Sequence, residues 1–532
     1  MRVVSTEDLE LAGERAGHAE ESSVLARIAR YERYFWTLPL ALGALLASTN
    51  RWYSEVDDEF LIIDSAAKSL SQTVGLYLHG IGEHEHPPLY DIILHGWLRL
   101  TGGNEHLLRL PSIFFYVLGT WILAKVAKHL GGVKSQICVL ILVIAWPFGF
   151  HFGRLATWYS FCFFLVSLLT LSYFNFLSRP TTKNWVLLLA ASVALVYSNY
   201  FGWVLLACLA LDYILGNVSD WPNRVRTLLL TGVILLVAYI PLFRPLLTET
   251  HSRVRPHGLG LATVASGVYN IFCTFVSESV APWFWYLGVP AGIAIAACLL
   301  MLLLRTPRSV KAFFLYFLGM VALMSVVGIV IPKRILFISP WLILAAGVTL
   351  GSVPGRLTRK ILVTALAIVA SIGWYGIFSR RLYAAPHWIE PWESVAIQSA
   401  DVIRNQGIVI SNNNSFFYYL TYLFPKESYP PARGGDFAGL LPYSVRVARV
   451  YNAQQWVDAN RPVASTILLV QGAHFDVPNE ATEEAESWLG ERCNLVQFEH
   501  QVHDDGIRWK RRFAPQLDQP EWRVEVRRYE CK

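Results

Sequence analysis

Carboxylates crowd into residues 55–91 of an otherwise apolar chain. The segment reads EVDDEFLIIDSAAKSLSQTVGLYLHGIGEHEHPPLYD, and it opens with Glu55, Asp57, Asp58 and Glu59. Carboxylates packed this closely raise one another's pKa unless a cation lies between them. One of these four carboxylates can therefore act as a general base near neutral pH. The alternative is a solvated acidic loop that takes no part in chemistry.

Histidines follow the carboxylates in the same segment. The loop holds His79, Glu83, His84, Glu85 and His86 ahead of a Pro-Pro pair. Imidazole and carboxylate groups bind divalent metals, and the candidate ligands are Asp58, His84 and His86. The i, i+2 spacing in a Gly-containing loop lacks the helical register of a zinc motif. Polar loop histidines that bond to the backbone are therefore the alternative.

The rest of the chain has the composition of a membrane protein with many spans. Its 532 residues are 54% hydrophobic and 16% charged, and the mean hydropathy is +0.39, whereas soluble proteins carry about a quarter charged residues. A crossing needs about 20 mostly apolar residues. About eleven segments qualify, near 34–49, 108–129, 135–151, 157–177, 184–199, 200–217, 226–246, 284–304, 311–331, 335–351 and 361–378.

The segment LYDIILHGWLRL at 89–100 decides on which side each loop lies. It is short and carries Asp91, His95 and Arg99, which predicts a helix lying on the membrane surface, as does the amphipathic run 60–74. With 89–100 kept out of the membrane, thirteen Lys and Arg fall in short loops on one side and three on the other. This bias follows the positive-inside rule. It predicts a cytoplasmic N-terminal tail (1–33), a membrane domain (34–380) and an exoplasmic loop 50–107.

A soluble exoplasmic domain is predicted for 381–532. Strand-like runs at 407–411, 465–471, 494–500 and 522–529 alternate with helix-like pieces at 392–406 and 479–490. This pattern is typical of a small α/β or α+β domain. Cys493 and Cys531 can pair if the domain faces an oxidising compartment. The net charge of +6 is explained by the loop bias rather than by nucleic-acid binding, and no Walker or GxGxxG motif indicates nucleotide chemistry.

Three cations stand out because the outer short loops hold so few. They are Arg154, Lys333 and Arg334, and Arg109 opens a span on the same side. Snorkelling is the usual explanation for a cation at a span end, but a cluster of Arg and Lys at a membrane surface is also what a lipid phosphate requires. The loop 247–282 is either a mobile cover over a site or a plain loop.

Together these residues resemble the GT-C glycosyltransferases that use polyprenyl-phosphate sugars, namely the protein O-mannosyltransferases and the lipid A aminoarabinose transferases. The shared features include Asp58-Glu59 after the first span and the HPPLY motif that begins at His86. RLPS from Arg109, an arginine after the third span (Arg154) and KRILFISPWLILAAG from Lys333 complete the pattern.

The resemblance implies an α-helical polytopic membrane protein of GT-C type that transfers a sugar, with inversion, from a polyprenyl phosphate to an exoplasmic acceptor. The preferred candidate for the acceptor would be lipopolysaccharide or another cell-surface glycan, and a protein would be the second candidate. Asp58 would be the base, and Glu59 and Glu85 would position the base or the acceptor. The substrate-binding residues would be Asp57, His86, Tyr90, Arg109, Arg154, Lys333 and Arg334, and the four cations would hold the polyprenyl phosphate.

Two other functions remain as alternatives. A lipid-linked sugar flippase or transporter would carry charged residues within its spans and often internal repeats, whereas here the ionisable residues gather at the outer ends. A polymerase or ligase of lipid-diphosphate glycans would share the outer cations but would not need the Asp-Glu and HPPLY motifs.

Overall fold

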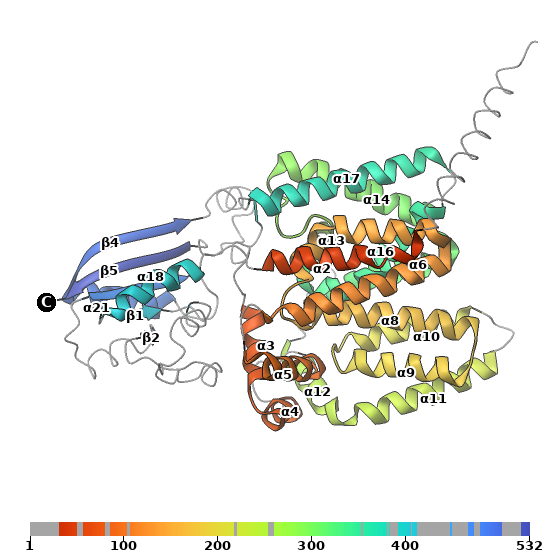
Figure 1. Cartoon of the computed structure of the whole chain (residues 1–532), viewed down its shortest axis with the longest axis horizontal. Coiled ribbons are helices and arrows are strands. Elements are labelled where there is room, and N and C mark those ends of the chain that lie inside the picture. Colours follow the sequence, from red (N-terminus) through yellow and green to blue (C-terminus); the bar gives the residue numbers. More distant parts are fainter. Residues whose placement is uncertain are drawn as a thin grey trace, which may run out of the picture.

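A helical bundle and a small sheet domain make up the computed structural model of the chain (Figure 1). The structure describes residues 31–50, 57–79, 86–103, 107–216, 221–253, 260–352, 355–379, 382–383, 392–405, 407–411, 416, 447–449, 466–472, 479–502 and 523–531. Within these ranges, six helices are long and apolar enough to cross a membrane, and four shorter apolar helices lie beside them.

The bundle helices coincide with the apolar segments of the sequence. They are α2 (Thr37–Ser48), α6 (Leu110–Ala145), α8 (Trp158–Ser178), α9 (Thr182–Val196), α10 (Gly202–Leu215), α11 (Trp221–Tyr239), α14 (Trp285–Arg305), α15 (Arg308–Val327), α16 (Ser339–Ser352) and α17 (Arg356–Ser379). Every predicted span contains one of these helices or half of α6. The span count of about eleven stays a prediction because several of the helices are short.

Two predicted spans form the two arms of α6. The helix turns at Gly132, whose φ of 76° and ψ of −171° interrupt the helical backbone. Only glycine adopts such a conformation without strain. Figure 1 shows the two arms meeting at the end of the bundle away from the sheet domain. We call this the far end, and we call the opposite end, where α2 stops at Ser48, the site end.

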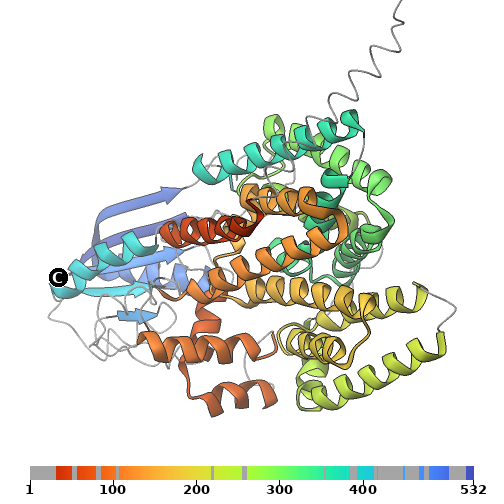
Figure 2. The same cartoon turned by 45° about the vertical axis from the view of Figure 1, so that its right-hand side comes forward.

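Three short helices lie across the site end. They are α3 (Asp57–Ala67), α4 (Leu70–His79) and α5 (Leu89–Thr101), and they sit beside the bundle rather than within it (Figures 1 and 2). The Nδ1 atom of His95 on α5 lies 2.7 Å from the carbonyl oxygen of Ala66, where α3 ends. The surface position predicted for 89–100 therefore agrees with the structure. The predicted helix 60–74 is instead two helices, interrupted at Lys68 and Ser69.

The segment 247–282 differs from its prediction as a loop. It contains the end of α12 (Phe243–Arg253) and all of α13 (Leu261–Val276). The α13 helix packs against α15 and α17, and Phe272, Cys273 and Val276 are buried. The run LATVASGVYNIFCTFV is apolar enough to pack as a helix on the bundle. Residues 254–259 lie outside the described structure.

The C-terminal domain has a five-stranded sheet in the order β2-β1-β3-β5-β4. Its elements are α18 (Trp392–Arg404), β1 (Ile408–Ser411), β2 (Val447–Arg449), β3 (Thr466–Gly472), α21 (Asn479–Arg492), β4 (Cys493–Val502) and β5 (Arg523–Cys531). The strands β2, β1 and β3 are parallel, and β5 runs antiparallel to both β3 and β4. All four predicted strands and both predicted helices are present, whereas β2 was not predicted.

Helices pack on this sheet on both faces, which explains why its central strands are apolar throughout. Ile408 and Ile410 pack with Leu489 of α21, whereas Val409 belongs to the core that includes Val395 of α18. A disulfide joins Cys493 to Cys531 across β4 and β5, as the sequence allowed. Such a bond is typical of oxidising compartments.

Candidate active site at the membrane surface

Glu59 in the first turn of α3 forms a buried ion pair with Arg109, which directly precedes α6. Two hydrogen bonds join them: Nε of Arg109 donates to Oε1 of Glu59 at 2.8 Å, and Nη2 donates to Oε2 at 2.6 Å. The two side chains are 0% and 1% exposed. A bidentate pair of this kind fixes the orientation of the two side chains as well as the distance between them. It therefore fastens the surface helix α3 to the start of the bundle.

The same carboxylate also holds the loop that follows α7 (Pro147–Phe152). The backbone N–H of Ala156 donates to Oε1 of Glu59 at 2.7 Å. Arg154, in the same loop, donates from Nη1 to the carbonyl oxygen of Thr49 at 2.7 Å, and Arg109 donates to the carbonyl oxygen of Asn50, also at 2.7 Å. The two arginines thus bind carbonyls at the C-terminal end of α2, where the helix dipole favours a cation.

Tyr90 of the HPPLY motif is tied to Ser112 of the RLPS motif. The two hydroxyl oxygens are 2.7 Å apart, and Tyr90 is 0% exposed. Ser112 also donates to the carbonyl oxygen of Thr157 at 3.3 Å. Four motifs that are distant in the sequence therefore interlock: the Asp-Glu pair, HPPLY, RLPS and the loop that begins at Arg154.

His86 lies at the edge of this network and is partly exposed. Its ring packs on that of Trp158 at 4.1 Å between centroids, with the planes tilted by 46°. Pro87 and Pro88 behind it are buried, and Leu89 donates its N–H to the carbonyl oxygen of Tyr197 at 3.1 Å. The motif thus presents an imidazole from a rigid backbone.

Lys333 and Arg334 lie on the 3₁₀ helix η6 (Pro332–Phe337), and both are partly exposed. Nη1 of Arg334 donates to the carbonyl oxygen of Ile329 at 3.1 Å. Because η6 packs against α7, α8 and α13, these cations reach the same end of the bundle as Arg154. They differ from Arg109 and Arg154, which are 1% exposed.

The remaining predicted site residues are only partly described. Asp57 and Asp58 form the start of α3, where a helix dipole favours carboxylates, but their side chains lie outside the described structure. His84 and Glu85 lie outside it entirely. Among the described residues, no group of three or more His, Cys, Asp or Glu could hold a metal ion. The metal site of Asp58, His84 and His86 therefore stays a prediction.

A buried carboxyl group, Asp91, was not predicted as part of the site. It lies in α5 and is 3% exposed, and the hydroxyl of Tyr77 on α4 donates to its Oδ2 atom. Burial raises the pKa of Asp91 to about 7, although the bond from Tyr77 opposes this change. Its position in the first turn of a helix that was predicted to lie on the membrane surface was the available signal.

Asp91 is expected to make stability fall as pH rises. An unfolded Asp titrates near pH 4, so between about pH 4 and 7 the folded protein holds a proton that the unfolded chain has lost. Folding stability should therefore decline across this window by up to about 1.4 kcal/mol per pH unit. Asp91→Asn stays neutral and keeps an acceptor for Tyr77, so it should flatten the decline. Thermal unfolding between pH 5 and 8 measures this, and the exposed Asp401→Asn variant should retain the wild-type response.

A second polar group at the site end was also missed. His151 of α7 is buried, and its Nδ1 atom lies 3.0 Å from Oγ of Ser277. Ser277 follows α13 with a φ of 66°, a conformation that is uncommon for a non-glycine residue. The ring of Tyr383 packs edge-on against His151 at 5.8 Å. Side chains after α7, α13 and α17 thus meet where the bundle joins the C-terminal domain.

Comparison with known proteins agrees with the motifs. The family model of the dolichyl-phosphate-mannose-protein mannosyltransferases matches residues 85–244. That segment contains HPPLY, RLPS and Arg154. Among curated protein sequences, none matches the chain significantly.

Solved structures show the same fold along almost the whole chain. ArnT from Cupriavidus metallidurans bound to undecaprenyl phosphate superposes with a TM-score of 0.55 at 14% identity, covering 92% of this chain and 97% of that one. The apo form of the same protein gives a TM-score of 0.53 with equal identity and coverage. The predicted fold, an α-helical bundle of apolar helices with a small C-terminal sheet domain, is confirmed, and it is the fold of ArnT. The predicted resemblance to GT-C glycosyltransferases is confirmed as well.

Proposed function

We propose that this GT-C membrane protein is an inverting glycosyltransferase that uses a polyprenyl-phosphate sugar as its donor. The observation that carries the proposal is the network centred on Glu59, because it joins four of the five motifs of the resemblance at one end of the bundle. The mannosyltransferase-family match and the ArnT-like fold support the reaction class. The acceptor would be lipopolysaccharide or another cell-surface glycan, with a protein as the second choice.

In this proposal the network positions the reactive groups and does not itself react. The polar atoms of Glu59 bond to Arg109 and Ala156, so the carboxylate orients the first turn of α3. Arg109 is buried against Glu59 and Asn50, which favours the same orienting role over the phosphate contact that the resemblance implied. Lys333 and Arg334 are the more accessible cations, so they are assigned to the donor phosphate. Arg154 is as buried as Arg109 and bonds to the Thr49 carbonyl, so it is assigned the same orienting role.

Asp58 is the proposed base, and Asp57 remains the alternative. The acceptor hydroxyl would attack the anomeric carbon while its proton passes to the Asp58 carboxylate. The bond between the sugar and the phosphate oxygen would break, and the polyprenyl phosphate would leave as an anion held by the cations. Glu85 and His86 would contact the acceptor or the base, and Tyr90 would act through Ser112. A divalent metal held by Asp58, His84 and His86 would supply further charge stabilisation to the leaving phosphate.

The proposed orientation places the site end and the C-terminal domain outside the cytoplasm. The positive-inside bias supports it, and so does the disulfide between Cys493 and Cys531, which needs an oxidising compartment to persist. A donor attached to a membrane lipid suits this side because nucleotide sugars are cytoplasmic.

The test is a transfer assay with the purified full-length chain. Labelled polyprenyl-monophosphate and polyprenyl-diphosphate sugars are offered separately, with a lipopolysaccharide extract or a protein extract as acceptor. We expect the monophosphate donor to be consumed and its sugar to appear on the glycan with inverted configuration. Use of the diphosphate donor alone would identify a polymerase or ligase instead. Passage of the labelled lipid across liposomes without consumption would identify a flippase.

A further inference from the structure

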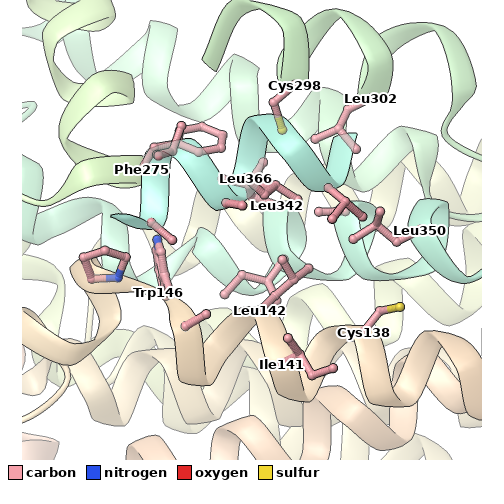
Figure 3. A pocket seen from close by; sticks show the side chains of 18 of the residues that line it. Cys138, Ile141, Leu142, Trp146, Phe275, Cys298, Leu302, Leu342, Leu350 and Leu366 are labelled. Atoms are coloured by element: carbon pink, nitrogen blue, oxygen red, sulfur yellow. The ribbon is translucent and has the colours of Figure 1, made fainter. Parts of the chain in front are cut away.

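An apolar groove runs along the bundle on the side formed by the second arm of α6, α14, α16 and α17. Its volume is about 400 Å³, within the range of about 300–1,000 Å³ typical of ligand sites. Figure 3 shows its two ends: Trp146 and Phe275 lie at one, and Cys138 and Leu350 at the other. Trp146 follows the second arm of α6 and Leu350 ends α16, so the groove extends from the site end to the far end.

The groove opens toward the surrounding membrane. Ile141 and Val363 line it and are 56% and 50% exposed, respectively, and in a membrane-spanning bundle this exposed surface faces lipid. At the site end, the indole N–H of Trp146 donates to the carbonyl oxygen of Thr274 at 2.7 Å. This bond holds the indole ring in place. Because the groove is apolar and opens toward the membrane, a lipid is its natural occupant, and the lipid would enter from the side of the bundle.

Positive charge marks the far end of the groove. Arg359, in the first turn of α17, lines the groove and is half-buried. Lys134 lies about one helical turn before Cys138, which lines the groove at this end, so both cations lie near it. No Asp or Glu occurs between Glu278 and Glu390, nor between Glu105 and Asp212. The helices that form the groove therefore carry cations without any carboxylate.

We propose that this groove is a binding site for an anionic phospholipid from the leaflet at the far end. The phosphate would lie at Arg359 and Lys134, and one acyl chain would lie between the second arm of α6, α16 and α17. Basic pockets between membrane helices on the cytoplasmic side are a known mode of acidic-lipid binding, and guanidinium binds phosphate with directed hydrogen bonds. The site is distinct from the Glu59 network, which lies at the other end of the bundle.

The test measures lipid binding by the delipidated full-length protein. Phosphatidylglycerol should raise its thermal unfolding midpoint, and phosphatidylcholine with the same acyl chains should not. Arg359→Gln should weaken the apparent affinity for phosphatidylglycerol by about tenfold or more, because it removes a charge-assisted hydrogen bond. Lys360→Gln is the matched control: this residue is exposed, does not line the groove and should leave the affinity unchanged.

A second pair of variants tests the acyl chain without altering charge. Ala367 lines the groove and is exposed, so Ala367→Phe should fill the groove, preserve the fold and weaken the binding of phosphatidylglycerol. Thr364→Phe, on an exposed position outside the groove, should not. Equal responses to both lipids, or an unchanged affinity in Arg359→Gln and Ala367→Phe, would overturn the proposal. So would displacement of phosphatidylglycerol by polyprenyl phosphate, since the groove would then belong to the donor.

Discussion

Asp58→Asn is expected to lower the rate of sugar transfer by about 10²–10⁴-fold, the usual contribution of a general base. Asn has the same size as Asp but cannot take the proton of the acceptor hydroxyl. The thermal unfolding midpoint should change little, because the buried contacts that hold α3 are made by Glu59. Initial rates at saturating donor, measured on protein of verified stability, give the result.

Asp57→Asn is the matched control, since it changes the neighbouring carboxylate in the same helical turn. Because Asp58 is the proposed base, Asp57→Asn should keep most of its activity. If both variants transfer sugar at the wild-type rate, neither carboxylate is the base.

The sequence predicted the helices well because their signals are local. Apolar runs of fixed length define spans, and shorter apolar runs define the strands at 408–411 and 466–472. The strand at 447–449 has only three residues and was not predicted. The α13 helix, with sixteen residues, was missed because the whole segment 247–282 was predicted as a loop.

The site was predicted as a set of residues but not as a set of contacts. Motif order indicated that Glu59, Arg109 and Arg154 lie at one site: Glu59 bonds to Arg109 and to Ala156, which lies in the same loop as Arg154. The burial of Arg109 and Arg154 could not be predicted, because a cation at a span end has the same sequence pattern whether it faces a lipid phosphate or a helix carbonyl. Only the structure shows the Asn50 and Thr49 carbonyls that bind Arg109 and Arg154. The pairing of Tyr77 with Asp91 depends likewise on how two surface helices pack.

Removing one partner of the Glu59–Arg109 pair is expected to cost about 3–5 kcal/mol of stability, because it leaves the other charge buried without its counterion. Glu59→Leu and Arg109→Met should each lower the thermal unfolding midpoint strongly, and each should reduce activity because α3 is no longer held to α6. The control is Asp401→Ala. It removes an exposed partner of Arg404, and exposed pairs contribute about 0–1 kcal/mol.

The double variant Glu59→Leu with Arg109→Met separates stability from function. Replacing both members of a buried pair by apolar residues is often neutral or stabilising, so the double variant should be more stable than either single variant. Its transfer activity should nevertheless stay low, since the bonds from Arg109 and from the Ala156 N–H to Glu59, which orient the first turn of α3, are lost. The phosphate-binding role implied by the resemblance predicts something different: Arg109→Met would remain stable and would raise the KM for the donor. Measuring the unfolding midpoint and the KM of the same three variants therefore decides whether Arg109 orients the helix or holds the donor.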